Sequence, residues 1–249
     1  MPKPNLFVTG GSRGIGASLT QLAAEQGYRV ILSYNKNAES AKSIVEHVQD
    51  SGGEAECVQL DITQYDAVIN FFEKFEGRFG QLNALVNNAG AVAPASRFEE
   101  LSVERLQQTF AANYFGTAYC CQEAVKLMST RYGKAGGVII NVSSIAASLG
   151  SPFEYVDYAS AKAAVDTLSI GLAKEVADEG IRVVSVRPGL IDTDLHADSG
   201  DRERPYKLSH LVPMKRPGTP SEVAHTILYL LSERASYITG TLIDVGGGR

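Results

Sequence analysis

The sequence predicts an α/β protein built on one doubly wound parallel sheet with helices on both faces. Short apolar runs alternate with longer segments of helical period, which is the rhythm of β-α-β units. The apolar runs contain few polar residues, as strands buried on both faces do. No linker, composition shift or internal repeat divides the 249 residues, so we expect a single domain over residues 1–249.

The predicted elements follow one another in regular order. Strands are expected at residues 6–9, 30–33, 56–60, 84–86, 137–142 and 181–186. The helices that alternate with them are expected at residues 17–25, 38–49, 67–79, in a long segment near 101–128, and at 156–176. The charged segment 192–217 breaks the rhythm and is either a solvated surface loop or a substrate lid beyond a strand's carboxyl end.

Composition narrows the possible partners. Hydrophobic residues make up 44% of the chain and charged residues 20%, as in a globular protein with a real core. A net charge of −5 without a dense Lys/Arg stripe argues against a nucleic-acid partner. There is no apolar run of the ~20 residues needed to cross a membrane, and the N-terminus lacks a signal-peptide pattern. Three cysteines without a CxxC pair and four scattered histidines predict neither disulfides nor a metal site, and a cytoplasmic location is expected.

A glycine-rich turn joins the first predicted strand to the first predicted helix. Glycines at such a turn let backbone N–H groups approach a pyrophosphate at the helix N-terminus. The spacing Gly10-x-x-x-Gly14-x-Gly16 differs from GxGxxG and has the TGxxxGxG form of another dinucleotide-binding lineage. An ordinary glycine-rich turn is the alternative, but the context of a first strand–turn–helix unit favours a Rossmann-like dinucleotide site.

The end of the second strand indicates which nicotinamide cofactor is preferred. NAD-binding proteins usually place a carboxylate there to hold the ribose 2′-hydroxyl. This strand ends in Ser-Tyr-Asn-Lys, and the first acid after it is Glu39. The missing carboxylate, together with nearby Arg13 and Lys36, favours NADP(H) over NAD(H). The alternative is that both cations are merely solvated.

Several motifs occur together in a recognisable order. They are Thr9-Gly10-x-x-x-Gly14-x-Gly16, Asn87-Asn88-Ala89-Gly90, Asn113, Ser144, Tyr158-x-x-x-Lys162 and Pro188-Gly189. Nearly end to end, the chain resembles the short-chain dehydrogenase/reductase family in its single-domain branch, especially bacterial glucose 1-dehydrogenase-like oxidoreductases and 3-oxoacyl-carrier-protein reductases. The resemblance implies hydride transfer between a nicotinamide and a carbonyl or secondary alcohol, and a homotetramer.

The chemistry of that reaction explains the tyrosine and the lysine. Hydride transfer to a carbonyl carbon requires a proton at the carbonyl oxygen. A phenol with a pKa near ~10 needs its anion stabilised to act as a base, and a lysine ammonium one helical turn away can do so. Tyr158 and Lys162 have that spacing. Tyr155 is two turns from Lys162, about 10 Å along the helix, and either lines the substrate pocket or packs at the helix entry.

The resemblance also implies residue roles. Tyr158 would be the acid/base, Lys162 would also hold the nicotinamide ribose, Ser144 would bind the substrate oxygen and Asn113 would complete a proton relay through water. Ser143 is expected to be structural, because neighbours on an extended strand point in opposite directions. The implied cofactor contacts are Gly10, Ser12, Arg13, Gly14, Ile15, Gly16, Tyr34, Asn35, Lys36, Asp61, Ile62, Asn87, Ala89, Gly90, Tyr158, Lys162, Pro188, Gly189, Ile191 and Thr193.

Other interpretations remain open at this point. Asp61 is either the adenine-side acid or a residue near a helix cap. A non-catalytic nucleotide-binding relative could keep the fold. The substrate could be a sugar or polyol bound by Glu154 and Asp192. A 3-oxoacyl carrier protein would instead need a basic patch, for which the candidates are Arg187, Arg202, Arg204, Lys207, Lys215 and Arg216.

Overall fold

The computed structural model describes residues 3–249, which form a seven-stranded parallel sheet in the order β3-β2-β1-β4-β5-β6-β7. This confirms the fold class that the sequence predicts. The strands are β1 (Asn5–Thr9), β2 (Arg29–Tyr34), β3 (Glu54–Gln59), β4 (Leu82–Asn87), β5 (Gly137–Val142), β6 (Ile181–Pro188) and β7 (Leu242–Val245).

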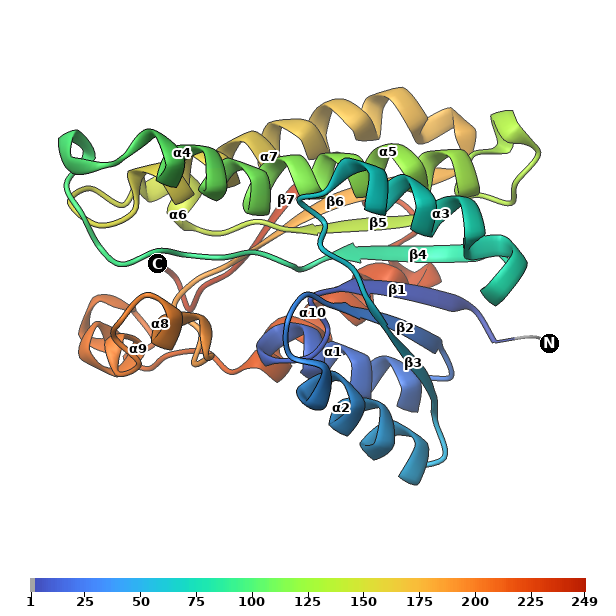
Figure 1. Cartoon of the computed structure of the whole chain (residues 1–249), viewed down its shortest axis with the longest axis horizontal. Coiled ribbons are helices and arrows are strands. Elements are labelled where there is room, and N and C mark those ends of the chain that lie inside the picture. Colours follow the sequence, from blue (N-terminus) through green and yellow to red (C-terminus); the bar gives the residue numbers. More distant parts are fainter. Residues whose placement is uncertain (1–2) are drawn as a thin grey trace.

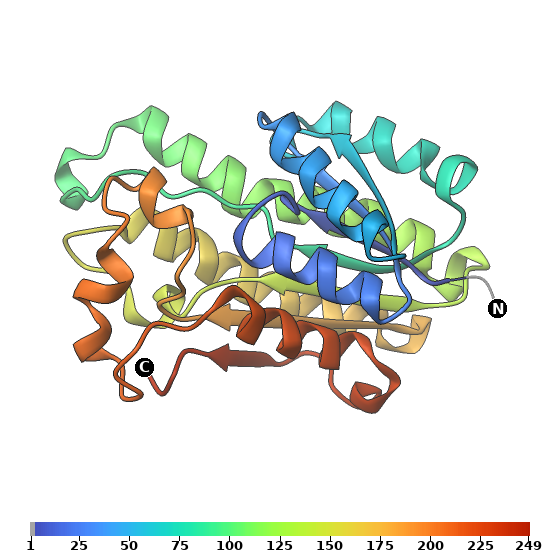
Figure 2. The same ribbon diagram turned by 90° about the horizontal axis from the view of Figure 1, so that it is seen from below.

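Helices cover both faces of this sheet (Figure 1). The layer seen at the front of Figure 2 consists of α1 (Gly14–Glu25), α2 (Ala38–Asp50) and α10 (Pro220–Leu231). The opposite layer consists of α3 (Tyr65–Phe79), α4 (Val103–Phe110), α5 (Gly116–Met128) and α7 (Val156–Val176). In residues 3–249, none of these helices combines the length and apolarity needed to span a bilayer.

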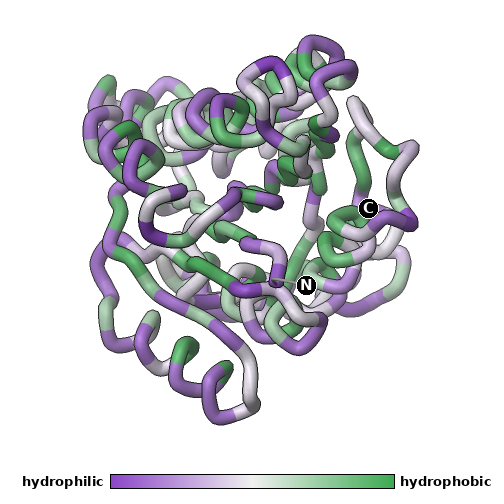
Figure 3. Tube along the Cα trace, turned by 90° about the vertical axis from the view of Figure 1, so that its right-hand side faces the viewer, coloured by the Kyte–Doolittle hydropathy of each residue, from purple (hydrophilic) through white to green (hydrophobic). Residues whose placement is uncertain are grey.

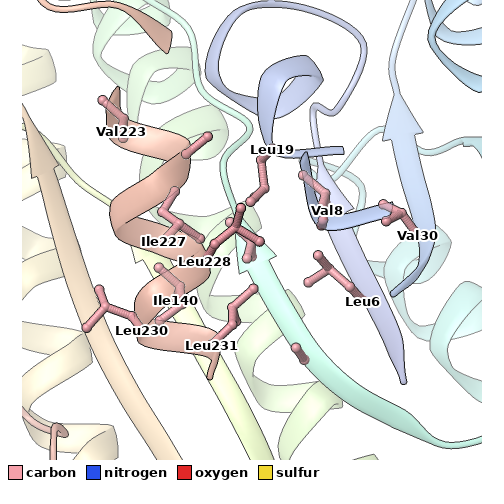
Figure 4. Packing of buried hydrophobic residues seen from close by; sticks show 14 of the residues in the cluster. Leu6, Val8, Leu19, Val30, Ile140, Val223, Ile227, Leu228, Leu230 and Leu231 are labelled. Atoms are coloured by element: carbon pink, nitrogen blue, oxygen red, sulfur yellow. The ribbon is translucent and has the colours of Figure 1, made fainter. Parts of the chain in front are cut away.

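Two apolar clusters hold the three layers together. One joins β1, β4 and β5 to α1 and α10, and Figure 4 shows Leu228 and Leu231 of α10 beside Leu19 of α1. The other lies between the sheet and the α3, α5 and α7 layer, with Phe7 and Phe72 at its centre. Figure 3 shows the same division, with hydrophobic colouring along the inner strands and hydrophilic stretches on the outer helices. Because both faces are covered, β1 is buried at every position.

The strand order reverses between β1 and β4, and this reversal positions the site. Residues Thr9 and Asn87 lie opposite each other at the carboxyl ends of these two strands. In open α/β sheets, ligands bind outside the carboxyl ends of the strands at such a switch point. The glycine loop follows β1, and the segment beginning at Asn88 follows β4, so both predicted motifs arrive at this edge.

The segment predicted as one helix near 101–128 is built differently. It begins at Val103, with Ser102 as its N-cap, and divides into α4, a π-helical turn at Ala111–Phe115, and α5. The π-turn adds a residue to the helical repeat at Asn113, whose side chain bonds the backbone of Thr109 and Ala91. Hydrophobic periodicity carries no signal for such an insertion, which is common at functional sites.

Segment 192–217 is an excursion closed at its base. Ile191 and Gly218 form a bridge, and Asp192 N donates to Gly218 O over 2.9 Å. The excursion contains the short helices α8 (Leu195–Asp198) and α9 (Arg204–Lys207), which lie beyond the carboxyl ends of the strands in Figure 1. The lid interpretation of this segment stays a prediction. The sequence pattern did not predict these two helices or the short α6 (Ala146–Leu149).

Candidate active site

The glycine loop is held in shape by contacts that exclude larger side chains. Gly10 and Gly14 adopt positive φ values of +64° and +53°, a region that favours glycine. A Cβ on Gly16 would lie 2.4 Å from Gly10 O and 2.5 Å from Asn88 Nδ2. Gly11 N donates to Ser33 O over 3.0 Å, which ties the loop to β2.

The loop leads into a helix N-terminus suited to an anion. Arg13 occupies the N-cap position of α1 in an extended conformation and, within the described chain, makes no side-chain capping hydrogen bond. The first N–H groups of a helix are unsatisfied by the helix itself and carry a partial positive charge. Together with the close backbone approach at Gly16, this geometry fits the pyrophosphate of a dinucleotide. Ser12 belongs to the same turn, and Ile15 packs against the core below it.

Residues at the ends of β2 and β3 line the adjoining part of this edge. Tyr34 is half-buried, whereas Asn35 and Lys36 are exposed. Asp61 Oδ1 accepts hydrogen bonds from Thr63 N and Thr63 Oγ1, over 3.0 and 2.8 Å. The Asp61 carboxylate therefore shapes the turn before α3, which is the structural alternative noted for it, and its adenine contact stays a prediction.

Ile62, also predicted as a cofactor contact, is buried against the beginning of α5. A Cβ on Gly116 would lie 2.6 Å from Ile62 Cδ1. Its side chain is thus part of the core.

Residues after β4 are cross-linked to the glycine loop. Thr9 Oγ1 accepts from Asn88 N and Ala89 N, both over 3.0 Å, and Asn88 Nδ2 donates to Gly10 O over 2.9 Å. Asn87 points into the core instead, where its Nδ2 donates to Asn141 Oδ1 over 2.9 Å. The buried Asn87 Oδ1 has no hydrogen-bond partner among the described residues. Asn87 therefore links β4 to β5, and a direct contact with a cofactor remains a prediction.

Gly90 lies between two of the predicted catalytic residues. A Cβ at this position would lie 2.8 Å from Asn113 Oδ1 and 3.4 Å from Lys162 Nζ. Asn113 is fully buried in the π-turn, and its Oδ1 accepts from Ala91 N over 3.1 Å. The turn thus brings Asn113 to the segment after β4, near Lys162 of α7.

The two adjacent serines after β5 take different roles, as the strand argument predicts. Ser143 is buried, and its hydroxyl donates to Lys162 O over 3.0 Å. Ser144 is half-buried; its Oγ accepts from Ala146 N over 3.1 Å, and it lies close enough to the Tyr158 phenol to lower the pKa of that group. Ser143 therefore anchors α7 to the sheet, and Ser144 faces the phenol.

Tyr158 and Lys162 are neighbours on α7 in an apolar setting. Lys162 Nζ lies 5.7 Å from the centre of the Tyr158 ring and donates to Val142 O over 2.8 Å. Burial raises the pKa of Tyr158 to about 12, against the lowering effect of the hydrogen bond with Ser144. Burial lowers the pKa of Lys162 to about 8, against the raising effect of Asp166. In this structure both groups are therefore shifted toward their neutral forms.

This result qualifies the expectation that the lysine lowers the tyrosine's pKa. Spacing places the ammonium near the phenol but says nothing about how dry the surroundings are. Desolvation disfavours each charged form, and it is the largest cause of both shifts.

The remaining predicted contacts lie where β6 ends. Pro188 is buried, and Gly189 N donates to Val245 O over 2.9 Å, where a Cβ on Gly189 would meet Gly246 Cα at 2.7 Å. Ile191 is buried at the base of segment 192–217. The methyl group of Thr193 would lie 3.4 Å from a Cβ on Gly14, so this threonine does reach the glycine loop.

Tyr155 is separated from the lysine, as its spacing predicts. It is buried at the N-cap of α7, and the Arg204 guanidinium of α9 lies 5.2 Å from its ring centre. Of the two interpretations considered for Tyr155, the packing one fits this geometry.

Sequence reasoning missed a buried group at the beginning of α7. Asp157 is 2% exposed and accepts hydrogen bonds from Arg105 and Thr109 of α4. The only local signal was the i, i+4 spacing of Arg105 and Thr109 on one helix face. Their pairing with a residue 52 positions away from Arg105 is visible only in the fold.

A glycine loop suited to a dinucleotide, together with a half-buried tyrosine one helical turn from a buried lysine, defines a nicotinamide-dependent oxidoreductase as the class of protein. Comparison with known proteins supports the same class. A family model described as enoyl-(acyl carrier protein) reductase matches residues 10–249. The uncharacterized oxidoreductase YgfF of Escherichia coli K12 is 45% identical over 98% of both chains.

More distant relatives carry assigned activities. The chain is 36% identical to 3beta-hydroxysteroid dehydrogenase 1 of Eggerthella lenta, covering 98% of this chain and 92% of that protein. It is 33% identical to the 3-oxoacyl-[acyl-carrier-protein] reductase FabG of Staphylococcus aureus, covering 97% and 96%. A solved short-chain dehydrogenase/reductase from Serratia marcescens superposes with a TM-score of 0.90 at 30% identity, covering 100% of this chain and 99% of that one. The chain belongs to the short-chain dehydrogenase/reductase family, and membership implies a nicotinamide cofactor, NAD(H) or NADP(H).

Proposed function

We propose that the protein is an NADP(H)-dependent reductase that converts a ketone to a secondary alcohol, with Tyr158 as the proton donor. The observation that carries the proposal is the position of the Tyr158 phenol. It faces Ser144, which lowers its pKa against the effect of burial, and it lies one turn from buried Lys162, whose Nζ is 5.7 Å from its ring centre.

Each residue of the site has a task in this reaction. When bound, the nicotinamide supplies the hydride for reduction or accepts it for oxidation. As the carbonyl carbon gains the hydride, its oxygen takes the proton of the Tyr158 phenol, while Ser144 hydrogen-bonds that oxygen. Because burial holds the pKa of Tyr158 at about 12, the phenol keeps the proton that reduction consumes. Lys162 would hold the nicotinamide ribose and, when charged, offset the charge left on the phenol. Asn113 would complete the relay that returns a proton from water.

The surroundings of the β2 terminus support NADP(H) over NAD(H). The residues that follow the buried part of β2 are Tyr34, Asn35, Lys36 and Asn37, and they bring no carboxylate to the ribose position. Asn37 Oδ1 is engaged as the N-cap of α2, where it accepts from Ser40 N over 3.0 Å. A 2′-phosphate would meet Lys36 and Arg13, both exposed, on this side.

Among substrates, the geometry supports a ketone with an apolar body best. The acids on which a sugar substrate depends are already used, because Glu154 pairs with Arg204 and Asp192 accepts from the Tyr206 hydroxyl. Between Ser144 and Tyr155 the chain exposes two large apolar side chains, Leu149 at 47% and Phe153 at 70%. The 36% identical relative acts, by its name, on a hydroxysteroid, which is consistent with this choice.

A carrier-protein substrate is supported by the 33% identity to FabG but not by the charges near the site. Four of the six cations proposed as a docking patch are paired with acids: Arg187 with Asp244, Arg204 with Glu154, Lys207 with Asp201 and Arg216 with Glu222. Such pairs leave little net positive charge for an acidic partner.

The wider organisation forms part of the same proposal. Residues 1–249 would make a single catalytic domain that acts in the cytoplasm as a homotetramer, the assembly expected from the family resemblance. Segment 192–217 would serve as the substrate lid, because it closes on itself at Ile191 and Gly218 and contacts the entry of α7 through Arg204.

Two measurements test the proposed chemistry. Fluorescence titration should show tighter binding of NADPH than of NADH, and the reverse order would disprove the cofactor assignment. Tyr158→Phe should abolish NADPH oxidation in the presence of a ketone while NADPH binding stays within about twofold, because the ring is kept and only the acidic proton is lost. Undiminished turnover in this variant would remove Tyr158 from the mechanism.

A panel of four oxidised substrates separates the substrate classes. It consists of a 3-oxosteroid, ethyl acetoacetate, gluconolactone and acetoacetyl-coenzyme A, each with NADPH. Highest kcat/KM on the steroid or the keto ester supports an apolar ketone. Highest kcat/KM on the lactone or the thioester would support the sugar or the carrier-protein class instead. Turnover of none, together with NADPH binding, would favour a nucleotide-binding regulatory relative.

A further inference from the structure

A half-buried arginine links three parts of the candidate site. Arg105 of α4 is 18% exposed in its side chain, and its Nε donates to Asp157 Oδ2 over 2.8 Å while its Nη2 donates to Asp157 Oδ1 over 3.3 Å. Its third nitrogen, Nη1, donates to Pro94 O over 2.6 Å. One guanidinium thus joins α4 to the first turn of α7 and to the segment that follows β4.

The acceptor of this arginine is the residue immediately before Tyr158. Only 1% of the Asp157 side chain is exposed. Burial raises the pKa of Asp157, but the hydrogen bonds from Arg105 and from the backbone N–H of Tyr158 outweigh it, and the pKa is lowered overall. The carboxylate is therefore ionised, and it belongs to the residue that directly precedes the tyrosine in α7.

Thr109 closes these contacts into a ring. Its hydroxyl donates to Asp157 Oδ2 over 3.1 Å, and its carbonyl oxygen accepts from Asn113 Nδ2 over 2.9 Å. Asn113 in turn holds the backbone of Ala91, through Nδ2 to Ala91 O over 2.8 Å and from Ala91 N to Oδ1 over 3.1 Å. Segment 91–94 is thereby held at one end by Asn113 and at the other by Arg105.

We propose that Arg105, Thr109 and Asp157 form a clamp that positions Tyr158 relative to Asn113 and segment 91–94. The clamp residues are positioning residues, because they act through the tyrosine and the asparagine. This inference rests on the proposed function, since it assigns the clamp to the proton transfer at Tyr158. Loss of the clamp lets the first turn of α7 move, and misplacement of a reacting group by about 1 Å can reduce a rate about a hundredfold.

The energetics of a buried ion pair argue that stability alone does not explain the clamp. Desolvating two charges offsets most of their attraction, so well-packed apolar side chains often replace such a pair at no loss of stability. What apolar side chains cannot supply is direction. The rigid fork of Arg105 fixes Asp157 in two directions and Pro94 in a third.

The smallest change that tests the clamp removes the Thr109 hydroxyl. Thr109→Val keeps the shape of the side chain and deletes the bond to Asp157, whereas Thr109→Ser keeps the bond. We expect Thr109→Val to lower kcat about threefold to tenfold with NADPH binding unchanged, and Thr109→Ser to keep kcat within about twofold of the parent protein. Equal kcat in the valine and serine variants would overturn the proposal.

A stronger test removes the charges together. Arg105→Met with Asp157→Leu should fold with an unchanged melting temperature, bind NADPH normally and lose about tenfold to a hundredfold in kcat. Hydrogen exchange of the α7 amides at residues 156–162 should also become faster. Parental kcat and parental exchange in the folded double variant would show that the pair is only structural.

The matched control lies at the opposite end of the sheet. Arg29 likewise joins a carboxylate, Glu56, and a backbone carbonyl, Phe79 O. Arg29→Met with Glu56→Leu should leave kcat and exchange at residues 156–162 at parental values, and a loss of kcat equal to that of the clamp variant would overturn the assignment.

Tyr158→Phe measured in the same assay keeps the two proposals apart. If Tyr158→Phe retains turnover, the proposed function fails. If Tyr158→Phe is inactive while the clamp variants are fully active, only the clamp fails.

Discussion

The two halves of the sheet, β1–β3 and β4–β7, differ in how many charged side chains they bury. On the β1–β3 side, the described residues 3–81 bury no charged side chain, and the shape of the site comes from glycines that let backbones approach closely. On the β4–β7 side the chain buries Glu123, Asp157, Lys162 and Asp166.

The difference fits the task that we propose for each side. A pyrophosphate is bound by backbone N–H groups, which need space and direction but no titratable group. Proton transfer needs ionisable side chains in dry surroundings, where their pKa values are shifted. The fold must therefore hold the partners of these side chains in fixed positions. Steric substitutions should therefore impair the first side, and charge substitutions the second.

The largest effect is expected from filling the space at Gly16. An alanine Cβ would lie 2.4 Å from Gly10 O and 2.5 Å from Asn88 Nδ2, so the loop has to shift. We expect Gly16→Ala to weaken NADPH binding about tenfold to a hundredfold, the equivalent of about 1–3 kcal/mol of overpacking strain.

Gly77→Ala on α3 is the control, because nothing lies within 4 Å of its Cβ position. It should bind NADPH normally and gain about 1 kcal/mol of stability. Equal binding by both variants would contradict the steric account.

A smaller effect is expected from neutralising Asp166. Its negative charge raises the pKa of Lys162 against the larger lowering by burial, so Asp166→Asn should lower that pKa further below about 8. The lysine then loses its proton at a lower pH, and the alkaline decline of kcat/KM should move to lower pH. Asparagine preserves the acceptor for the Ser185 hydroxyl, which lies 2.8 Å from Asp166 Oδ1.

Asp244→Asn provides the comparison for this charge. Asp166 and Asp244 both pair with Arg187, but the Asp244 side chain is 48% exposed and does not contribute to the pKa shift of Lys162. The alkaline limb of its pH profile should stay in place. Equal displacement in both variants would mean that Arg187, and not the buried carboxylate, controls the lysine.

The smallest effect is expected from an exposed charge. Glu222 accepts from Thr219 N in the capping box of α10 and pairs with Arg216, and these bonds lower its pKa to about 2. Because the folded pKa is depressed, the stabilisation is fully present above the ordinary value of 4.5 and is lost as pH falls toward about 2. With 41% of the side chain exposed, Glu222→Gln should cost about 1 kcal/mol or less at pH 7 in urea unfolding. The difference from the parent protein should shrink at pH 3, and a constant difference would refute this origin.

The sequence anticipated the parts of the site that depend on local spacing. Periodicity predicted the alternation of strands and helices, because buried strands and amphipathic helices impose different repeats. It misplaced the ends of elements, for example by giving β3 as 56–60 where the strand is Glu54–Gln59. It also merged α4, the π-turn and α5 into one helix, because one inserted residue leaves the apolar repeat almost unchanged.

By itself, the sequence determined the fold class, the glycine loop and the i, i+4 placement of Tyr158 and Lys162, since all three depend on residues close together in the chain. Only the tertiary structure decided that burial, and not the lysine, dominates the pKa of Tyr158. Only the tertiary structure joined Arg105 to Asp157, or paired Glu154 and Asp192 with residues of segment 192–217. Desolvation and charge pairing depend on which distant segments exclude water around a group, and that is set when the helices pack on the sheet.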